Sequence, residues 1–549
     1  MFVPTDSQLA ARDLFLVGES LKIKAFAGCG KTTTLEFIAR SGGGNGLYVA
    51  FNNAIARESA SKFRNKARCM TTHAMALRHL PPEMKTKAGQ GLGLRRSHLS
   101  AFIKRRCARD DVRTVDRARE VQGALREFCL SADREPGLQH VHAMEGHLLQ
   151  NVDPARVLRD LHVVWASISD PAGELPLSHD TYLKWFHIHG APLPYAYILV
   201  DESQDQTPVV VDLLRRSGRQ VVWVGDPHQE LYAWRGAVNA METIGDVNEV
   251  VLSKCFRFGP KLAEVASALL VDLGEYTPLI GNDDIDTVIA KRHQPVRIVR
   301  NNMTLLAKVA HLAKRNTIFV VGGTSRLEKL VADTRALMQG KRVASGQLFG
   351  FTNWAEVQDR ANGRYGHPYK DFVKVVDEIG CRGVSGVLSR LASSAANSDI
   401  TLTTVHNSKG CQFDYVSVYD DFRGEKERGR FVERMPVDVT RLLYVAVTRA
   451  KHGLFMDRSL ANRFQLTRIL QAPAQVPHPH AEQDSPELPQ TKANVPAACR
   501  EPNFSLAPRD LKDLSSREAR SNSNMSAYGK YGDVLNGMAI GLFLWILLH

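Results

Sequence analysis

Short runs of apolar, β-branched residues alternate with longer segments of helical periodicity along most of the chain. The runs YAYILVDE, QVVWVGD and TIFVVGG end in acidic residues or glycines, which is typical of buried parallel strands. Segments with a helical pattern follow two of them, VVVDLLRRSG after the first and PKLAEVASALLVDL after the second. This alternation predicts a doubly wound α/β sheet.

Two regions interrupt the alternation. Between His73 and Pro194 the sequence is polar, helical and dense in Arg and Lys, which predicts an inserted helical subdomain. From Ala472 onward Pro, Ala and charged residues dominate without periodicity, so a disordered tail is expected. The chain closes on an apolar run from Gly537 to His549 that is short for a spanning helix. A packed C-terminal helix or a non-native extension is favoured over membrane contact.

Length and charge narrow the class of protein. A chain of 549 residues exceeds what one hydrophobic core usually serves, so several domains are expected. The net charge of +13 favours a polyanionic partner, either nucleic acid or an anionic membrane. The eight cysteines include no C-x-x-C pair, which argues against a zinc ribbon and fits a reducing compartment.

The stretch AFAGCGKTTTLEF has the character of a phosphate-binding loop between a strand, LKIKAFA, and a helix, TTTLEFIAR. Ala25 replaces the first glycine of the usual pattern. Gly28 and Gly30 would let backbone amides curl around anionic oxygens, Lys31 would reach the terminal phosphates, and Thr32 would hold magnesium. The helix N-terminus adds a favourable dipole. A chance glycine-rich turn is the alternative.

A pair of carboxylates follows the next buried strand in YILVDESQDQTP. Asp201 ends the strand and Glu202 is its neighbour. In a phosphate-loop enzyme the strand-end aspartate can hold magnesium through water, and the glutamate can orient and deprotonate an attacking water. Such a pair is usually structural when it stands alone. With the phosphate loop upstream, the catalytic interpretation is favoured.

The order of further motifs resembles that of superfamily 1A DNA helicases of the UvrD/Rep type, and within them the F-box DNA helicase branch without its F-box. The matching segments are PTDSQLAA (Q motif), AFAGCGKT (I), YVAFNNAIA (Ia), TTHAMALRHL (Ib), DESQD (II), VGDPHQELYAWRGA (III), LSKCFRF (IV), TLTTVHNSKGCQFDYVSV (V) and RLLYVAVTRAKHGL (VI). They run in family order from Thr5 to about Leu454. The family tolerates alanine at the first position of motif I.

The resemblance implies two RecA-like P-loop NTPase lobes, each divided by an insertion. The expected boundaries are lobe 1A at 1–73 and 191–250, a helical insertion (1B) at 74–190, lobe 2A at 251–325 and 399–471, a reduced 2B-like insertion at 326–398, and the tail at 472–549. The segment between motifs IV and V is much shorter than in larger members. Since 2B regulates unwinding in the family, translocation without strand separation stays open.

The resemblance also implies a site for ATP and Mg²⁺. The expected catalytic residues are Lys31, Asp201, Glu202, Gln229, Arg257 and Arg449. The expected nucleotide contacts are Gln8, Ala27, Gly28, Cys29, Gly30, Lys31, Thr32, Thr33, Phe256, Arg257, Gln412 and Arg449, with Thr32 and Asp201 as metal ligands. Gln8 matches the adenine-reading residue, Phe256 the aromatic over the adenine, and Gln229 the sensor of the terminal phosphate. Arg257 and Arg449 match the arginine fingers, and Gln412 replaces a glutamate that touches the sugar.

The family contacts single-stranded DNA through residues of motifs Ia, Ib, III and V. The matching positions are Phe51, Asn52, Thr72, His73, Tyr232, Trp234, Arg235 and His406. Aromatic rings stack on any base because every base has a π-face. Trp234 stands between small residues and Arg235, which suits an exposed stacking platform. A lone aromatic or histidine is otherwise more often a core residue.

The resulting hypothesis is an ATP-dependent DNA helicase or translocase that moves 3′ to 5′ on single strands in repair, recombination or replication. The alternatives are an ATPase that translocates without unwinding, a small-molecule phosphotransferase, and a nucleic-acid-binding scaffold with a dead ATPase. The expected partners are single-stranded DNA and single/double-strand junctions, with protein partners through the tail. A monomeric motor is expected, in the cytoplasm and associated with the nucleoid in a bacterium, or in the nucleus in a eukaryote.

Overall fold

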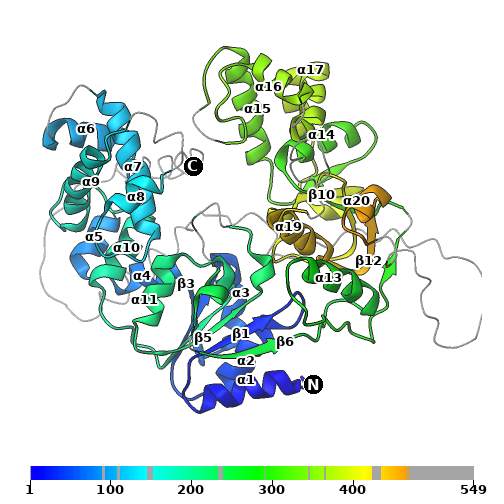
Figure 1. Ribbon diagram of the computed structural model, residues 1–549, viewed down its shortest axis with the longest axis horizontal. Helices are drawn as coiled ribbons and strands as arrows, with labels where there is room; N and C mark the ends of the chain where they lie inside the picture. Colours follow the sequence, from blue (N-terminus) through cyan, green and yellow to red (C-terminus); the bar gives the residue numbers. More distant parts are fainter. Residues whose placement is uncertain are drawn as a thin grey trace, which may run out of the picture.

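A computed structural model describes residues 2–89, 93–107, 112–144, 152–232, 236, 239–245, 247–290, 292–343, 346–363, 366–422, 435–466 and 469. These residues contain two parallel β-sheets in two lobes, and a helical part stands above each lobe (Figure 1). The predicted α/β fold with two RecA-like lobes is thereby confirmed. Within the same ranges, no helix combines the length and apolarity needed to cross a membrane. The tail predicted at 472–549 lies outside them.

The first sheet has the strand order β3-β2-β4-β5-β1-β6, with every pairing parallel. Its strands are β1 (Leu21–Ala25), β2 (Gly46–Ala50), β3 (Ala67–Thr71), β4 (Tyr197–Val200), β5 (Gln220–Gly225) and β6 (Asn248–Leu252). Three of them are the predicted strands LKIKAFA, YAYILVDE and QVVWVGD. Helices α1 (Asp6–Leu16), α2 (Lys31–Ser41), α3 (Asn53–Phe63), α11 (Pro208–Arg215) and α12 (Ala240–Thr243) accompany the sheet.

A hydrophobic core covers each face of the first sheet, which explains why the sequence of strand β4 is apolar throughout. Tyr197 and Leu199 enter one hydrophobic core, whereas Ile198 and Val200 enter another. Alternate side chains of a strand point to opposite faces, so a strand between two helical layers needs no polar positions. The carboxyl ends of β1, β4 and β5 meet at one edge of the sheet, where a doubly wound fold binds its ligands.

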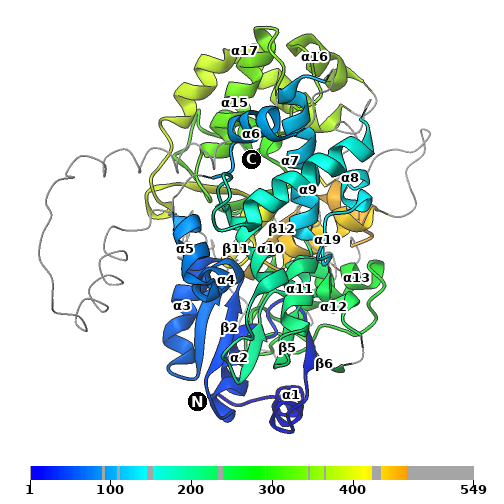
Figure 2. The same cartoon turned by 90° about the vertical axis from the view of Figure 1, so that its left-hand side faces the viewer.

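The first helical part lies between β3 and β4. It contains α4 (Thr72–His79), α5 (Pro82–Gly89), α6 (Arg96–Arg106), α7 (Thr114–Leu130), α8 (Leu138–His142), α9 (Pro154–Ser169) and α10 (His179–His189). Figure 2 shows α7, α9 and α10 stacked above the sheet. Its hydrophobic core is continuous with one face of that sheet. A buried ion pair with several hydrogen bonds, between Arg117 of α7 and Asp160 of α9, joins two of these helices.

The second sheet has the order β7-β12-β11-β8-β10-β9, again with parallel pairing throughout. Its strands are β7 (Val288–Ile289), β8 (Val296–Val299), β9 (Ile318–Val320), β10 (Ile400–Thr404), β11 (Phe413–Val418) and β12 (Ala450–Met456). The predicted strand TIFVVGG is β9. Helices α13 (Pro260–Asp272), α14 (Asn302–Leu312), α18 (Val405–Ser408), α19 (Val437–Val447) and α20 (Arg458–Arg463) surround it.

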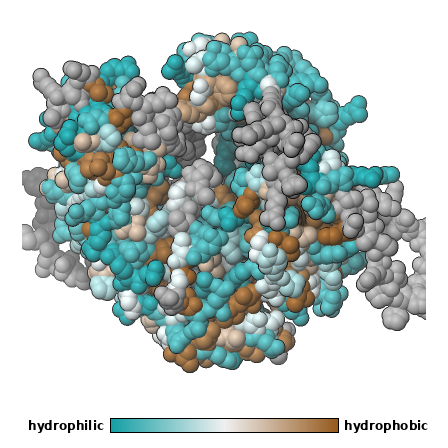
Figure 3. Space-filling view, in the orientation of Figure 1, coloured by the Kyte–Doolittle hydropathy of each residue, from teal (hydrophilic) through white to brown (hydrophobic). Residues whose placement is uncertain are grey.

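The second helical part lies between β9 and β10. It consists of α15 (Ser325–Met338), α16 (Trp354–Asn362) and α17 (His367–Leu388), which pack with α14 around a hydrophobic core that also includes residues of β8, β9 and β10. Trp354 meets Phe372 edge-on in this core, with 5.8 Å between ring centroids. The space-filling view shows the two helical parts as mostly hydrophilic projections with a hollow between them (Figure 3).

Candidate active site between the two lobes

The predicted phosphate loop connects β1 to α2. Gly28 and Gly30 both have left-handed backbone conformations, with φ of 79° and 78°, and α2 begins at Lys31. A Cβ atom at Gly28 would lie 2.6 Å from Cys255 Sγ and 2.8 Å from Arg257 Cβ. Both the backbone conformation and the close approach of the second lobe therefore require glycine at position 28. The loop has the curled form that can surround an anion with amides.

The hydroxyl of Thr32 and the carboxylate of Asp201 lie side by side at the end of this loop. Thr32 Oγ1 donates a hydrogen bond of 2.9 Å to Asp201 Oδ2, and the Tyr48 hydroxyl donates one of 2.7 Å to the same oxygen. Burial raises the pKa of Asp201, and the charge of Glu202 adds to this increase. Adjacent hydroxyl and carboxylate oxygens are hard ligands of the kind Mg²⁺ prefers, so this donor set fits a magnesium ion.

Glu202 has a left-handed backbone, with φ of 51°, which is unusual for a residue other than glycine and typical of functional sites. Its carboxylate accepts a hydrogen bond from Gln204 Nε2. Burial opposes ionisation, but the charges of Lys31 and Lys409 outweigh it and lower the pKa of Glu202 to about 2. The carboxylate is therefore ionised at neutral pH and able to accept a proton or orient a water.

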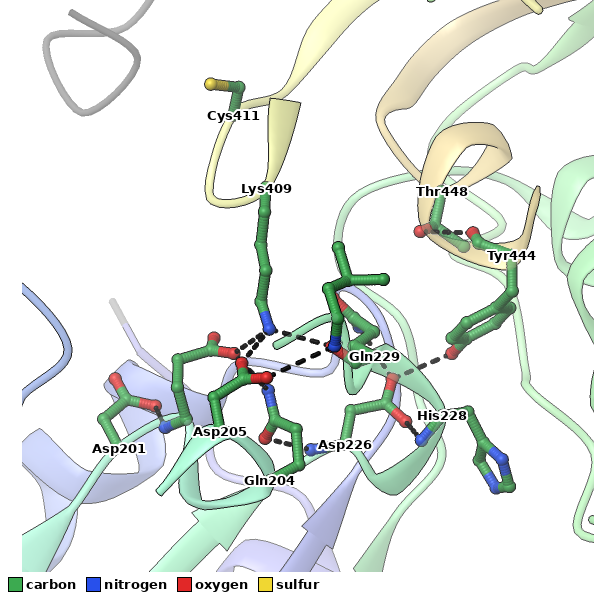
Figure 4. Close-up of polar contacts among 12 residues, drawn as sticks. Asp201, Gln204, Asp205, Asp226, His228, Gln229, Lys409, Cys411, Tyr444 and Thr448 are labelled. Carbon is green, nitrogen blue, oxygen red and sulfur yellow. Dashed lines mark hydrogen bonds and ion pairs between the residues drawn. The ribbon is translucent and has the colours of Figure 1, made fainter. Parts of the chain in front are cut away.

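Hydrogen bonds cross directly from the first lobe to the second at Asp226, which follows β5. Asp226 Oδ2 accepts from Gln229 Nε2 at 2.7 Å and from the Tyr444 hydroxyl of α19 at 3.0 Å. The same hydroxyl accepts the backbone N–H of Ala27, in the phosphate loop, at 3.1 Å. Figure 4 shows Tyr444 and Lys409 extending from the second lobe toward these first-lobe groups. The lobes thus share one hydrogen-bonded network.

The two predicted arginines, far apart in sequence, both lie at this interface. Arg449 is only 2% exposed, and its Nη2 donates to Gln229 Oε1 at 3.1 Å. Arg257 Nη1 donates to the carbonyl oxygen of Thr448 at 2.9 Å. Burial lowers the pKa of Arg449 to about 9, and the charge of Arg257 contributes to the decrease. Two cations therefore stand close together beside the first lobe's carboxylates.

The predicted adenine contacts flank the phosphate loop on its other side. Gln8 Nε2 donates to Thr34 Oγ1 at 2.8 Å, and Gln8 Oε1 accepts the N–H of Thr5 at 3.0 Å. A Cβ atom at Gly30 would lie 3.5 Å from Gln8 Nε2 and 3.6 Å from Phe256 Cδ2, so both side chains border the loop. Phe256 is 42% exposed, as a ring available for stacking must be. Among the remaining predicted nucleotide contacts, Ala27 and Cys29 are buried, whereas Thr33 and Gln412 are exposed.

Three of the predicted DNA contacts form an aromatic cluster across the interface. Phe51 stacks on Tyr232, with ring centroids 5.3 Å apart and an angle of 27°, and His406 meets Tyr232 at 6.1 Å. Phe51 and Tyr232 belong to the first lobe and His406 to the second. All three are half-buried. The predicted contacts Trp234 and Arg235 lie outside the described residues.

The other predicted DNA contacts make local structural interactions. Asn52 Oδ1 accepts the N–H of Ile55 at 2.9 Å and caps α3. His73 Nε2 lies 3.3 Å from Asp180 Oδ1, which connects α4 to α10. Thr72 is the first residue of α4. Backbone contacts to a nucleic acid are compatible with these positions, and Asn52 directly follows Phe51 of the aromatic cluster.

The sequence matches two family models. The UvrD/REP helicase N-terminal domain matches residues 191–245, and the UvrD-like helicase C-terminal domain matches residues 374–460. The N- and C-terminal domains of the UvrD-like helicases are thus both represented in the chain. F-box DNA helicase 1 of Gallus gallus is 28% identical over 492 residues, covering 82% of this chain and 48% of that protein. F-box DNA helicase protein 1 of Schizosaccharomyces pombe is 28% identical over 498 residues, covering 82% and 56%.

A shorter match connects the chain to a bacterial relative of the UvrD-like helicases. The probable DNA helicase II homolog of Mycoplasma genitalium is 29% identical over 92 residues, covering 15% of this chain and 13% of that protein. The chain spans about half the length of the two F-box helicases that it matches. The DNA helicase family is thus established for the lobes, whereas activity, substrate and partners are matters for proposal.

Sequence reasoning about this UvrD-like helicase missed four residues that complete the interface. They lie inside the quoted motifs: Asp205 in DESQD, Asp226 in VGDPHQ, Lys409 in VHNSKGCQ and Tyr444 in RLLYVAV. Asp205, Asp226 and Tyr444 are buried, and the Lys409 side chain is only 7% exposed. A charged or hydroxyl-bearing residue in such an apolar setting needs a partner, and this was the signal available.

Proposed function

We propose that the chain is an ATP-driven motor that moves 3′ to 5′ along single-stranded DNA and thereby unwinds duplex or removes bound proteins. The observation that carries this proposal is the contact of Arg449 with Gln229 beside Asp201 and Glu202. Cations of one lobe reach the carboxylates and phosphate loop of the other only when the lobes are together. An ATP site divided in this way links each hydrolysis event to lobe movement.

Each part of the site has a role in hydrolysis. The amides of the phosphate loop and Lys31 bind the phosphates, and Glu202 accepts a proton from the attacking water. Arg257 and Arg449 stabilise the negative charge that develops on the transferred phosphoryl group. A magnesium ion held by Thr32 and Asp201 would neutralise phosphate charge. Gln229 bonds both Asp226 and Arg449, so it is suited to sense the terminal phosphate.

The aromatic cluster supports the DNA half of the proposal. Because Phe51 and Tyr232 come from one lobe and His406 from the other, lobe movement changes the space available to a base between them. Stacking on these rings, and on Trp234, would be independent of base identity. Alternating grip and release during ATP cycles would advance the strand. Such a motor would work on single strands and junctions wherever the host keeps its DNA, in a nucleoid or a nucleus.

The size of the second helical part favours one alternative, translocation without unwinding. Only α15, α16 and α17, the last of them kinked at Gly380, lie as α-helices between β9 and β10 among the described residues. If strand separation needs a larger regulatory insertion, the chain would move along single strands and displace proteins, but leave duplexes intact.

Two substrates separate these outcomes. Streptavidin displacement from oligonucleotides biotinylated at either end measures translocation and its direction, and duplexes with a 3′ or a 5′ tail measure unwinding. We expect faster displacement from the 5′ end and unwinding only with a 3′ tail, with no activity in Lys31→Ala. Displacement without unwinding would select the alternative. Equal rates at both ends would contradict directional movement.

A further inference from the structure

Lys409 links the two lobes at the centre of the site. It follows α18 in the second lobe, yet its ammonium group lies among first-lobe groups (Figure 4). Nζ forms an ion pair with Asp205, donates 2.8 Å to the backbone carbonyl of Gln229, and lies 3.5 Å from Glu202 Oε2. The Asp205 side chain is fully buried. Such a buried pair is held firmly because separating it leaves an uncompensated charge.

The same ammonium group also contacts the aromatic cluster. Nζ lies 5.5 Å from the centroid of the Tyr232 ring, within the range of a cation–π interaction. Tyr232 in turn stacks on Phe51. His406, whose ring meets Tyr232, precedes Lys409 by three residues in the segment that forms α18. One side chain therefore contacts both Glu202, the proposed base of the hydrolysis reaction, and Tyr232, one of the rings proposed to stack on DNA.

We infer that Lys409 is a positioning residue through which single-stranded DNA at the aromatic cluster controls Glu202; this inference rests on the proposed function. Without DNA, the ammonium group stays beside Glu202 and Asp205 and holds the Glu202 carboxylate in an ion pair, away from the attacking water. A base that enters the cluster displaces Tyr232 and His406, and the Lys409 ammonium group turns away from Glu202 while it keeps its ion pair with Asp205. Glu202 is then free to take the proton of the attacking water, so DNA accelerates hydrolysis.

The test is ATP turnover with and without oligo(dT) in a variant that uncouples the two sites. Lys409→Met/Asp205→Asn removes both charges of the buried pair, so that neither is left unpaired. The matched control is Lys451→Met/Asp414→Asn, which removes a half-exposed ion pair within the second lobe. Lys451 Nζ lies 3.6 Å from Asp414 Oδ1. Binding of oligo(dT), followed by fluorescence anisotropy, is measured on the same samples.

We expect turnover without DNA to rise about tenfold in the uncoupled variant, because the ion pair between Lys409 and Glu202 is lost. The DNA stimulation ratio falls by the same factor, while the KM for ATP and the affinity for oligo(dT) stay within about twofold of wild type. The control keeps the wild-type ratio. A second variant, Lys409→Gln, retains a donor for the Gln229 carbonyl. It should show the same effect, and it takes the place of the double variant if that variant does not fold.

Two results would overturn the inference. One is an unchanged stimulation ratio in folded variants of Lys409. The other is an equal fall of turnover with and without DNA, which would make Lys409 a general structural support of the site. Failure of the proposed function looks different, because wild-type turnover itself would then not respond to oligo(dT).

Discussion

The hydroxyl of Tyr444 connects the phosphate loop to the second lobe, and Tyr444→Phe removes this connection alone. The hydroxyl accepts the N–H of Ala27 at 3.1 Å and donates to Asp226 at 3.0 Å. Ala27 and Tyr444 are both fully buried, so solvent water does not replace the hydroxyl as acceptor for the Ala27 N–H. The phenyl ring of the variant keeps the packing of α19 against the loop.

The cost of this change follows from the two bonds. A buried N–H without an acceptor costs about 1–3 kcal/mol, and this applies to Ala27. Asp226 loses one donor but keeps Gln229 Nε2 and the N–H of His228. A total near 2 kcal/mol corresponds to a factor of about 30 at 25 °C. We therefore expect the Ala27 amide to exchange its hydrogen about 30-fold faster, since its closed state is destabilised by that amount.

Hydrogen exchange followed by mass spectrometry measures this effect in the peptide that contains Ala27. Tyr182→Phe is the control, because its hydroxyl bonds His179 at 2.9 Å within the first helical part and far from the loop. The control should change exchange around α10 and leave the Ala27 peptide unaltered. If Tyr444→Phe leaves the protection of the Ala27 peptide at the wild-type level, the described link between loop and second lobe is refuted.

Further changes give three predictions. Gly28→Ala, whose Cβ would collide with Cys255 and Arg257, should lower ATP affinity and turnover by at least about tenfold, as measured in steady state. Glu202→Gln should keep ATP binding but lose about 10²–10⁴-fold in turnover, because it removes a proton acceptor; equal losses in both would contradict that role. Burial lowers the pKa of Lys184 to about 8, against 10.5 for an exposed lysine. The unfolded chain then binds more protons, so this group's contribution to stability rises between these pH values, and Lys184→Met should flatten the pH dependence of Tm there.

The sequence predicted the elements of the fold well because each carries a local signal. The strands that end at Ala25, Val200 and Gly225 are short apolar runs followed by glycine or an acidic residue. The tight loop at Gly28 and Gly30 could be predicted because few residues other than glycine adopt a positive φ. That Arg257 and Arg449 act at one ATP site was implied only by the order of the motifs, since spacing alone does not indicate it, and this stays a prediction.

Contacts between the lobes were the part that sequence did not reveal. Lys409 and Asp205 are 204 residues apart, and Tyr444 and Asp226 are 218 apart. Neither pair has a local periodicity that indicates its partner, because pairing depends on how two separately folded sheets meet. Asn52 illustrates a related ambiguity, since an asparagine before a helix suits both an N-cap and a nucleic-acid contact.

Steady-state ATP turnover of the wild-type chain, with and without oligo(dT), shows whether DNA drives hydrolysis. We expect strong stimulation by the oligonucleotide and no turnover in Lys31→Ala under either condition. Turnover that is the same with and without nucleic acid would contradict a DNA-driven motor and return the chain to the class of small-molecule phosphotransferases.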